Sequence, residues 1–271
     1  MPELPEVETI KLQMEKELVG KTIKEVVVNK PKMWQGKRED IEGKKIESVK
    51  RQGKMIVWQL SGGAEMTFHL KMTGQLVFNG AEGKYTHIII NFTDGTKLLF
   101  NDVRQFGWVK NTERSRSIKI SNYELGPDAL SNEFTLEYLQ KILSNWNRPV
   151  KLLLCDQEKL SGIGNIYASE ILFCSGIAPH HRASELTKDH PEKVERLYHC
   201  VKNVLQEALK YGGTSSSDEQ YVNLYGEKGE MQKHLKVYQR ENQPCSRRCG
   251  GVIKRLTLSG RSSFFCPKCQ S

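Results

Sequence analysis

The sequence predicts an α+β protein with an N-terminal helix on a β-sandwich, then a helical region, then a small β-hairpin that carries cysteines. Three observations predict this order. Runs rich in β-branched and aromatic residues dominate the chain up to about residue 110. The hydrophobic period changes to that of an α-helix after residue 135. Four of the seven cysteines fall between residues 245 and 269.

The first expected element is a helix over residues 3–18. Its apolar residues recur at helical spacing and form one face, made of Val7, Ile10, Met14 and Leu18. Pro5 suits the first turn of a helix, and Gly20 suits the position after its end.

Strand-like runs follow this helix. They occupy residues 22–29, 45–50, 54–60, 65–70, 75–78 and 86–92. Asp94-Gly95 is a strong signal for a hairpin turn, and Gln52-Gly53 is a weaker one. A short helix packed on a β-sandwich or barrel accounts for this part of the chain.

The second half of the chain has the pattern of a helical domain. A polar stretch with Gly126-Pro127-Asp128 predicts a linker. Helices are expected at residues 135–145, 148–158, 166–175 and 191–211. Residues 161–165 (SGIGN) are too glycine-rich for a helix and predict a tight turn between two of them. A polar loop is expected at 213–230, and strand-like pieces at 235–239, 252–258 and 262–266.

The charge distribution indicates a polyanionic partner. The formal net charge is +9, and residues 231–271 hold nine Lys or Arg residues but one acidic residue, Glu241. Such a basic surface suits nucleic acid, because each neutralised phosphate releases counterions. The alternative is a basic tail without a specific partner. No run approaches the roughly 18 apolar residues of a membrane helix, and the N-terminus lacks the pattern of a secretion signal, so we expect a cytoplasmic protein with no membrane partner.

The clustered cysteines predict one structural zinc ion. Cys245, Cys249, Cys266 and Cys269 form two pairs separated by a hairpin-length insert, as a tetrahedral zinc site requires. Zinc would supply the folding energy that so small a segment lacks; the alternative is four unrelated thiols. The three other cysteines, Cys155, Cys174 and Cys200, are expected as core thiols, because they are scattered through apolar or helical stretches.

The N-terminus offers a second chemical signal. Removal of Met1 would leave the imino nitrogen of Pro2 free, directly before the carboxyl group of Glu3. An α-amino group has a pKa near 8, so a useful fraction is neutral at pH 7 and can attack a sugar C1′ to form a Schiff base. The alternative is that Pro2 only starts the helix.

Five motifs along the chain carry a resemblance to a known family. They are PELPEVET at the N-terminus, HLKMTG at 69–74, DVRQFG at 102–107, SGIGNIYASE at 161–170 and the cysteine hairpin with SGR at 259–261. In this order and spacing they resemble formamidopyrimidine-DNA glycosylases. The resemblance implies a catalytic β-sandwich domain (1–115), a linker (116–132), a helix–two-turn–helix DNA-binding domain (133–234) with a lesion loop (212–231), and a zinc finger (235–271).

The resemblance also implies an activity. Members of this family remove oxidised purines, 8-oxoguanine and formamidopyrimidines, from duplex DNA and then cleave the abasic strand by β,δ-elimination. The partner is therefore double-stranded DNA with oxidised bases or abasic sites, and a monomer associated with the nucleoid is expected. The implied catalytic residues are Pro2 as nucleophile, Glu3 as general acid and base, Lys54 and Arg261, with Glu6 as a supporting carboxylate.

The remaining implied residues contact DNA. Met72 fills the space of the extruded base, while Arg104 and Phe106 face the orphaned base and wedge the opposite strand. Further contacts to phosphate or near the lesion are implied for His69, Lys151, Asn165, Tyr238 and Arg255. By pattern without the resemblance, Met72 and Phe106 are more typical of core residues.

Departures from the family pattern keep two alternatives open. The first cysteine pair has three intervening residues in place of two, and Val103 and Gln105 replace a proline and an arginine. Residues 212–223 (GGTSSSDEQYVN) are longer and more acidic than the usual lesion loop. One alternative is an endonuclease VIII-like glycosylase that prefers oxidised pyrimidines. The other is a zinc-dependent DNA-binding protein without catalysis.

Overall fold

The structure, a computed structural model, describes residues 1–112, 124–215 and 220–271. The chain divides into two compact units. Unit 1 comprises residues 1–123 and 208–232, and unit 2 comprises residues 124–207 and 233–271. The segment 208–232 therefore clusters with the first unit, whereas the sequence grouped the loop 212–231 with the helices. Part of the expected linker, residues 116–123, lies outside the described residues.

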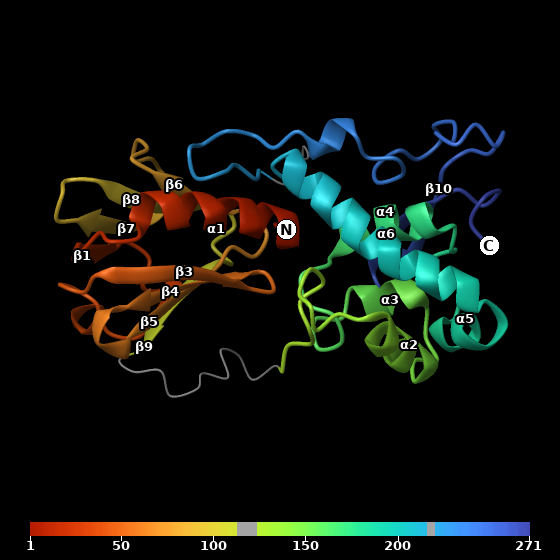
Figure 1. The fold of residues 1–271 in the computed structure, drawn as a ribbon. Coiled ribbons are helices and arrows are strands. Elements are labelled where there is room, and N and C mark those ends of the chain that lie inside the picture. The colour runs from red at the N-terminus through yellow and green to blue at the C-terminus, as the bar shows by residue number, and fades with distance from the viewer. Residues whose placement is uncertain (113–123, 216–219) are drawn as a thin grey trace. The chain divides into compact units, whose positions relative to one another are not determined.

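Helix α1 (Leu4–Leu18) opens unit 1 and buries the predicted apolar face. Glu3 is its N-cap, and Glu3 and Glu6 form a reciprocal capping box. The helix packs against β3 (Ile46–Gln52) and β4 (Met55–Leu60). Figure 1 shows it lying along the sandwich.

Two sheets form the sandwich of unit 1. The four-stranded antiparallel sheet has the order β1 (Ile23–Val28), β7 (Thr86–Phe92), β8 (Lys97–Asp102) and β6 (Gly74–Phe78). The five-stranded sheet has the order β2 (Trp34–Gln35), β9 (Trp108–Thr112), β5 (Glu65–His69), β4 and β3, with only β2 parallel to its neighbour. Their inner faces share one core with α1, in which Trp58 packs on Phe68 and Phe92. Among the described residues, short 3₁₀ turns occur at Pro31–Met33, Arg38–Asp40, Ser61–Gly63 and Met231–Lys233.

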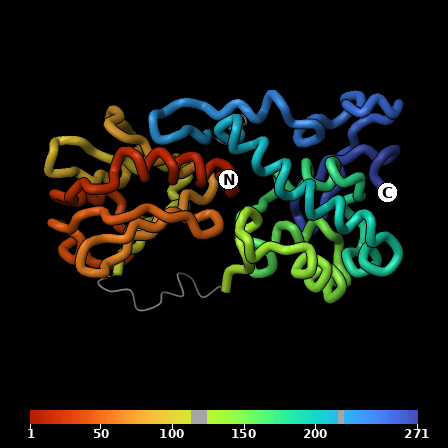
Figure 2. Tube along the Cα trace, in the orientation of Figure 1, coloured from red at the N-terminus to blue at the C-terminus, as the bar shows by residue number. Residues whose placement is uncertain are grey.

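Residues 208–232 bring the chain back to unit 1, as Figure 2 shows. Backbone amides of this segment bond to side chains of α1, with Thr214 donating to Glu6 (2.7 Å) and Leu224 donating to Gln13 (2.9 Å). The hydroxyl of Tyr225 donates to Glu17 (2.9 Å). The described parts of this loop are thus fixed along the helix that begins at Leu4.

Unit 2 is helical and ends in a hairpin. Its helices are α2 (Leu136–Ser144), α3 (Val150–Leu154), α4 (Asn165–Ser175), α5 (Ala183–Asp189) and α6 (Pro191–Lys210), and its strands are β10 (Lys254–Leu258) and β11 (Arg261–Phe265). The predicted fold class, with a leading helix, a sandwich, a helical domain and a cysteine hairpin, is confirmed. In the described part of the chain, no helix combines the length and apolar character needed to cross a membrane.

Two local expectations for unit 2 were wrong. Residues 235–239 form no strand, because the buried carboxylate of Glu170 accepts the backbone N–H groups of Lys236, Val237 and Tyr238 and curls the segment around itself. Cys174 and Cys200 are not free thiols but form a disulfide between α4 and α6, whose packing brings their Cα atoms to 5.8 Å.

Candidate functional site

The N-terminus of α1 places Pro2 and Glu3 at the start of a rigid element. Both residues are buried, and Glu3 is 2% exposed. The backbone N–H of Glu3 donates to Glu6 Oε2 at 2.8 Å, which closes the capping box. The capping box therefore fixes the backbone on which the predicted nucleophile and its neighbouring carboxyl group sit.

Glu6 also holds the base of the loop that follows α6. Its Oε1 accepts the N–H of Thr214, a residue with no exposed surface. Gly213 lies in the left-handed region (φ +83°), and a Cβ there would come within 2.7 Å of the Glu6 carboxylate. The hydroxyl of buried Tyr221 lies 3.4 Å from the Glu6 carbonyl oxygen, and burial together with the Glu6 charge raises the pKa of Tyr221. Glu6 thus joins the N-terminus to both sides of the loop, through its carboxylate at Thr214 and through its backbone carbonyl at Tyr221; residues 216–219 lie outside the described part.

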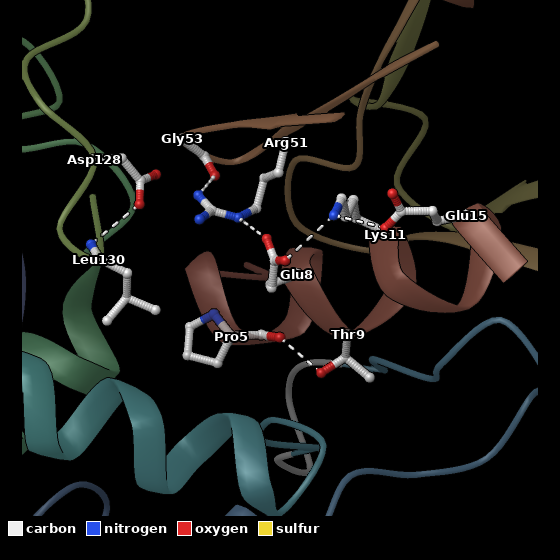
Figure 3. A network of polar contacts seen from close by, with 9 residues as sticks. All are labelled: Pro5, Glu8, Thr9, Lys11, Glu15, Arg51, Gly53, Asp128 and Leu130. Carbon is white, nitrogen blue, oxygen red and sulfur yellow. Dashed lines mark hydrogen bonds and ion pairs between the residues drawn. The ribbon is translucent and has the colours of Figure 1, made fainter. Parts of the chain in front are cut away.

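Lys54 sits in a braced turn between β3 and β4. Figure 3 shows Glu8 of α1 bound to Arg51, with Oε2 and Nε 2.5 Å apart. The same guanidinium donates from Nη1 to the Gly53 carbonyl at 3.0 Å. Lys54 follows directly and is 7% exposed. Helix α1 therefore fixes this turn as well as the N-terminus.

His69 ends β5, opposite Met55 at the start of β4. Burial, followed by the positive charges of Lys71 and Lys54, lowers the pKa of His69 to about 3. The ring is therefore neutral at physiological pH. Its Nδ1 accepts the backbone N–H of Lys71 at 3.0 Å, so the ring proton resides on Nε2. A neutral histidine with an Nε2–H donor can bond to phosphate without adding charge.

Three side chains project from turns at one edge of the four-stranded sheet. Met72 is half-buried in the turn between β5 and β6, so it is not a core residue. Arg104 and Phe106 occupy the turn between β8 and β9, with the guanidinium carbon 4.9 Å from the ring centroid. Phe106 is 55% exposed, and Val103 in the same turn is 40% exposed, so this turn presents neighbouring apolar side chains to solvent. These exposures fit residues that insert into a DNA stack.

In unit 2, the glycine-rich turn leads into the N-terminus of α4. Asn165 is the first helical residue, and Gly164 at the N-cap supplies no side chain to cap the amides. Gln157 fixes the turn: its Nε2 donates to the Ile163 carbonyl at 2.8 Å, and its Oε1 accepts the Gly162 N–H at 3.0 Å. The N-terminus of a helix favours a phosphate, because its backbone N–H groups and the helix dipole attract negative charge.

Lys151 is buried, in contrast to the direct DNA contact that the resemblance implies. It is 1% exposed, and its Nζ donates to Ser169 Oγ (3.1 Å), the Ser262 carbonyl (2.9 Å) and Ser263 Oγ (2.9 Å). Ser169 in turn donates to the carbonyl of Asn165 at 3.0 Å. Lys151 therefore ties the start of α4 to the hairpin strand that begins at Arg261.

The hairpin carries Arg255 within β10 and Arg261 at the start of β11, directly after a tight turn. Ser259 and Gly260 both have positive φ (46° and 75°) and connect Leu258 to Arg261, as a two-residue turn requires. Arg255 and Arg261 are exposed. Tyr238 is 8% exposed and packs edge-on against Phe264, so the polar segment before the finger is anchored to the hairpin.

Four thiols converge at the base of the hairpin. The sulfurs of Cys245, Cys249, Cys266 and Cys269 all lie within 4.8 Å of one another, with the pairs 245–269 and 249–266 at 3.8 and 3.5 Å. A tetrahedral zinc ion with Zn–S bonds of about 2.3 Å separates its sulfurs by about 3.8 Å. Gly251 is required beside them, since a Cβ there would lie 2.6 Å from the Cys266 sulfur. The donor set and its spacing fit one structural zinc ion.

The longer first cysteine pair docks the finger on α4. Arg247 donates from Nη2 to the carbonyls of Phe173 (2.6 Å) and Cys174 (2.9 Å) at the C-terminal end of that helix. Its guanidinium also stacks on the Phe173 ring, 4.5 Å from the centroid. The backbone of Arg248, directly before Cys249, has a left-handed conformation (φ 53°), which lets the loop of three intervening residues still bring Cys249 to the site. A cation at a helix C-terminus is stabilising, so the insertion adds an anchor.

Within each unit, the structure therefore groups many of the sequence-predicted residues. Unit 1 holds the N-terminal, Lys54, His69 and wedge residues, and unit 2 holds Asn165, Lys151, the hairpin arginines and the cysteines. Sequence reasoning missed Gln157 and Arg247. Gln157 gave no pattern signal, but the extra residue between Cys245 and Cys249 could have directed attention to Arg247.

Comparisons with known proteins give consistent matches along the chain. Residues 1–109 match the formamidopyrimidine-DNA glycosylase N-terminal domain, residues 125–220 match the H2TH domain of the same enzymes, and residues 242–271 match a zinc finger found in FPG and IleRS. A formamidopyrimidine-DNA glycosylase of Bacillus cereus is 38% identical and covers 100% of this chain and 99% of its own length. That of Pelotomaculum thermopropionicum is 39% identical, with 100% and 99% covered.

Solved structures show the same similarity. The crystal structure of the MutM (Fpg) protein from Thermus thermophilus has a TM-score of 0.89 and 37% identity, covering 99% of this chain and 98% of that one. A complex of Lactococcus lactis Fpg with DNA containing an abasic site has a TM-score of 0.90 and 28% identity, covering 99% of each chain.

Proposed function

This chain belongs to the formamidopyrimidine-DNA glycosylase family, and we propose that it uses Pro2 as the nucleophile that removes the damaged base. It is a DNA glycosylase for formamidopyrimidine and 8-oxoguanine lesions and a lyase for the abasic site that remains. Its partner is DNA, and its cofactor is one structural zinc ion. The alternative of a DNA-binding protein without catalysis is set aside, because its full-length relatives are enzymes.

The observation that carries the proposed mechanism is the capped start of α1, which holds Pro2 and Glu3 on one fixed backbone. After removal of Met1, the Pro2 nitrogen attacks C1′ of the extruded sugar, the N–C1′ bond forms, the glycosidic bond to the base breaks, and the proton released from Pro2 passes to the departing base. Glu3 donates a proton to the ring oxygen as the sugar opens, which leaves an iminium ion on Pro2. The Glu3 carboxylate then takes a proton from C2′ as the 3′-phosphate leaves, loss of the C4′ proton expels the 5′-phosphate, and water hydrolyses the iminium to release the enzyme.

Positive and neutral donors hold the phosphates around this reaction. In unit 1, Lys54 in its braced turn and the neutral Nε2–H of His69 contact the backbone beside the lesion. In unit 2, Asn165 at the start of α4 and Arg255 and Arg261 on the hairpin do the same. Tyr238 adds a contact beside the hairpin, and Lys151 acts from the interior by fixing Asn165 and Arg261 together.

The wedge residues replace the extruded base. Met72 enters the vacated position, Phe106 unstacks the opposite strand, and the Arg104 guanidinium faces the edge of the orphaned base. The cation–π contact between Arg104 and Phe106 supports this arrangement, because it holds the two side chains side by side.

The base preference rests on the loop held by Glu6. The Glu6 carboxylate fixes the backbone at Thr214, and Tyr221 anchors the other side, so the described ends of the loop form a preformed wall that suits a flat oxidised purine. The second candidate, a preference for oxidised pyrimidines as in endonuclease VIII-like enzymes, is favoured only by the longer, acidic loop sequence. We further propose that the protein acts as a monomer in the cytoplasm, on nucleoid DNA.

One panel of duplexes tests both the mechanism and the preference. We expect excision of 8-oxoguanine at least tenfold faster than of thymine glycol, and trapping of the enzyme on DNA by borohydride. Pro2→Gly replaces the ring-constrained secondary amine with an unconstrained primary amine, so trapping on the 8-oxoguanine duplex should fall at least tenfold, while Pro31→Gly, a proline outside the site, should leave it unchanged. Equal trapping by the Pro2 variant would exclude the proposed nucleophile, and faster excision of thymine glycol would favour the second candidate.

A further inference from the structure

We propose that the buried carboxylate of Asp102, together with the hydroxyl of Thr73, is the positioning device that makes the two wedge-bearing turns insert into DNA as one body. Asp102 ends β8, and Thr73 precedes β6. This inference rests on the proposed function and extends it to residues that do not themselves touch DNA.

The antiparallel pairing of β6 and β8 places the turn before β6 and the turn after β8 at the same end of the sheet. Gly74, the first residue of β6, pairs with Asp102, the last residue of β8. The turn that carries Met72 and the turn that carries Arg104 and Phe106 therefore leave the sheet from paired positions. Their wedge side chains come from separate parts of the sequence, so some contact between the turns must set their relative position.

The Asp102 carboxylate supplies that contact. It is 1% exposed, and its Oδ1 accepts the Thr73 hydroxyl (2.5 Å) and the Arg104 N–H (3.1 Å). Its Oδ2 accepts the Gly107 N–H at 2.7 Å. One side chain thus binds both ends of the turn 103–107 and the neighbouring turn.

Thr73 completes a closed set of bonds. Its hydroxyl donates to Asp102 and accepts the Arg104 N–H at 3.1 Å, so the backbone of Arg104 is held by both turns at once. Asp102 is itself fixed, since its carbonyl accepts His87 Nε2 at 2.9 Å and its N–H donates to the Tyr85 carbonyl at 3.0 Å. A shift of the Met72 turn therefore moves the backbone that carries Arg104.

The position of Asp102 requires a side chain with two hydrogen-bond-accepting oxygens. Both backbone partners of the Asp102 side chain are N–H donors, so an asparagine would direct its NH₂ group at either Arg104 or Gly107, whichever way the amide is turned. Gly107 is equally constrained, because a Cβ there would lie 2.6 Å from the Phe100 ring and 3.1 Å from Asp102 Oδ2. The arrangement is therefore specific to these residue types.

Two substrates distinguish a loss of wedge positioning from a general loss of folded enzyme. A duplex with 8-oxoguanine requires the wedge, whereas a single-stranded oligonucleotide with an abasic site has no stack to fill. We expect Asp102→Asn and Thr73→Val to slow single-turnover excision from the duplex at least tenfold. The fluorescence of a 2-aminopurine next to the lesion rises when the bases unstack, and this rise should slow by the same factor as excision. Cleavage of the single-stranded abasic site should stay within twofold of wild type, and Thr73→Ser, which keeps the hydroxyl, should restore excision.

Asp94→Asn is the matched control. Asp94 accepts the N–H and hydroxyl of Thr96 in the exposed turn at the other end of β8. The Asp94→Asn variant therefore weakens comparable hydrogen bonds at a position far from the wedge residues. Unchanged duplex excision in Asp102→Asn and Thr73→Val would overturn the proposal. So would an equal loss on both substrates, which would indicate general unfolding. A wild-type protein inactive on both substrates would instead remove the proposed function, and this inference with it.

Discussion

Glu6 joins the N-terminus of the chain to the loop that follows α6, and its replacement by glutamine measures the strength of that connection. The two oxygens of the carboxylate take different partners: the N–H of Glu3 at 2.8 Å and that of Thr214 at 2.7 Å. Glutamine keeps the shape of the side chain but has one oxygen. Its NH₂ group must therefore face one of two backbone donors, both of which are buried.

The expected cost follows from these two bonds. A hydrogen bond to a charged group contributes about 1.5–3 kcal/mol, and a neutral one about 1 kcal/mol. Glu6→Gln loses one bond and weakens the other, so we expect a loss of about 2–4 kcal/mol in the free energy that holds the loop on α1. That is a large share of a typical folding free energy of about 5–15 kcal/mol.

Hydrogen exchange and urea unfolding measure this loss. The Thr214 amide in Glu6→Gln should exchange at least thirtyfold faster than in the wild type, and excision of 8-oxoguanine should fall by a similar factor. Glu15→Gln on the same helix is the control, because its exposed ion pair with Lys11 contributes well under about 1 kcal/mol. Equal protection of Thr214 in the two variants would refute the assigned role of Glu6.

Further predictions concern zinc, Lys151 and His69. Elemental analysis of Cys266→Ser should find no zinc, and its Kd for an abasic duplex should rise at least tenfold, because the hairpin that carries Arg261 depends on zinc to fold. Full DNA affinity of the metal-free variant would contradict this prediction. In a double-mutant cycle, the losses of DNA-binding free energy caused by Lys151→Met and Arg261→Ala should be less than additive, since Lys151 acts through the strand that begins at Arg261. Strictly additive losses would exclude that link. The pKa of His69 is lowered to about 3, below its ordinary value of 6.5, so the unfolded chain takes up this proton first as the pH falls. Its contribution to stability is therefore complete above about pH 6.5 and decreases toward pH 3. His69→Gln should flatten the decrease in thermal stability between pH 6.5 and 4, and an unchanged slope would show that His69 is not the cause.

The sequence predicted those features that local patterns determine. The period of Val7, Ile10 and Met14 gave helix α1 and its buried face, and the β-branched runs gave most strands of the sandwich. The cysteine spacing gave the zinc site, because two pairs of thiolates across a hairpin leave few other arrangements. These features depend on neighbours in sequence.

Features set by packing could not be predicted in the same way. The disulfide between Cys174 and Cys200 depends on how α4 lies against α6. Residues 235–239 have a strand-like pattern, yet Glu170, more than 60 residues earlier, takes their backbone donors. The burial of Lys151 likewise depends on serines of a distant strand. In each case a contact between remote segments outweighs the local pattern.

Locating the covalent bond between enzyme and DNA tests the central claim most directly. The protein is reduced with borohydride on a duplex with 8-oxoguanine, digested, and analysed by tandem mass spectrometry. The account predicts a mature chain without Met1 and a sugar remnant on the imino nitrogen of Pro2. A remnant on a lysine such as Lys54, or an active enzyme that retains Met1, would contradict it.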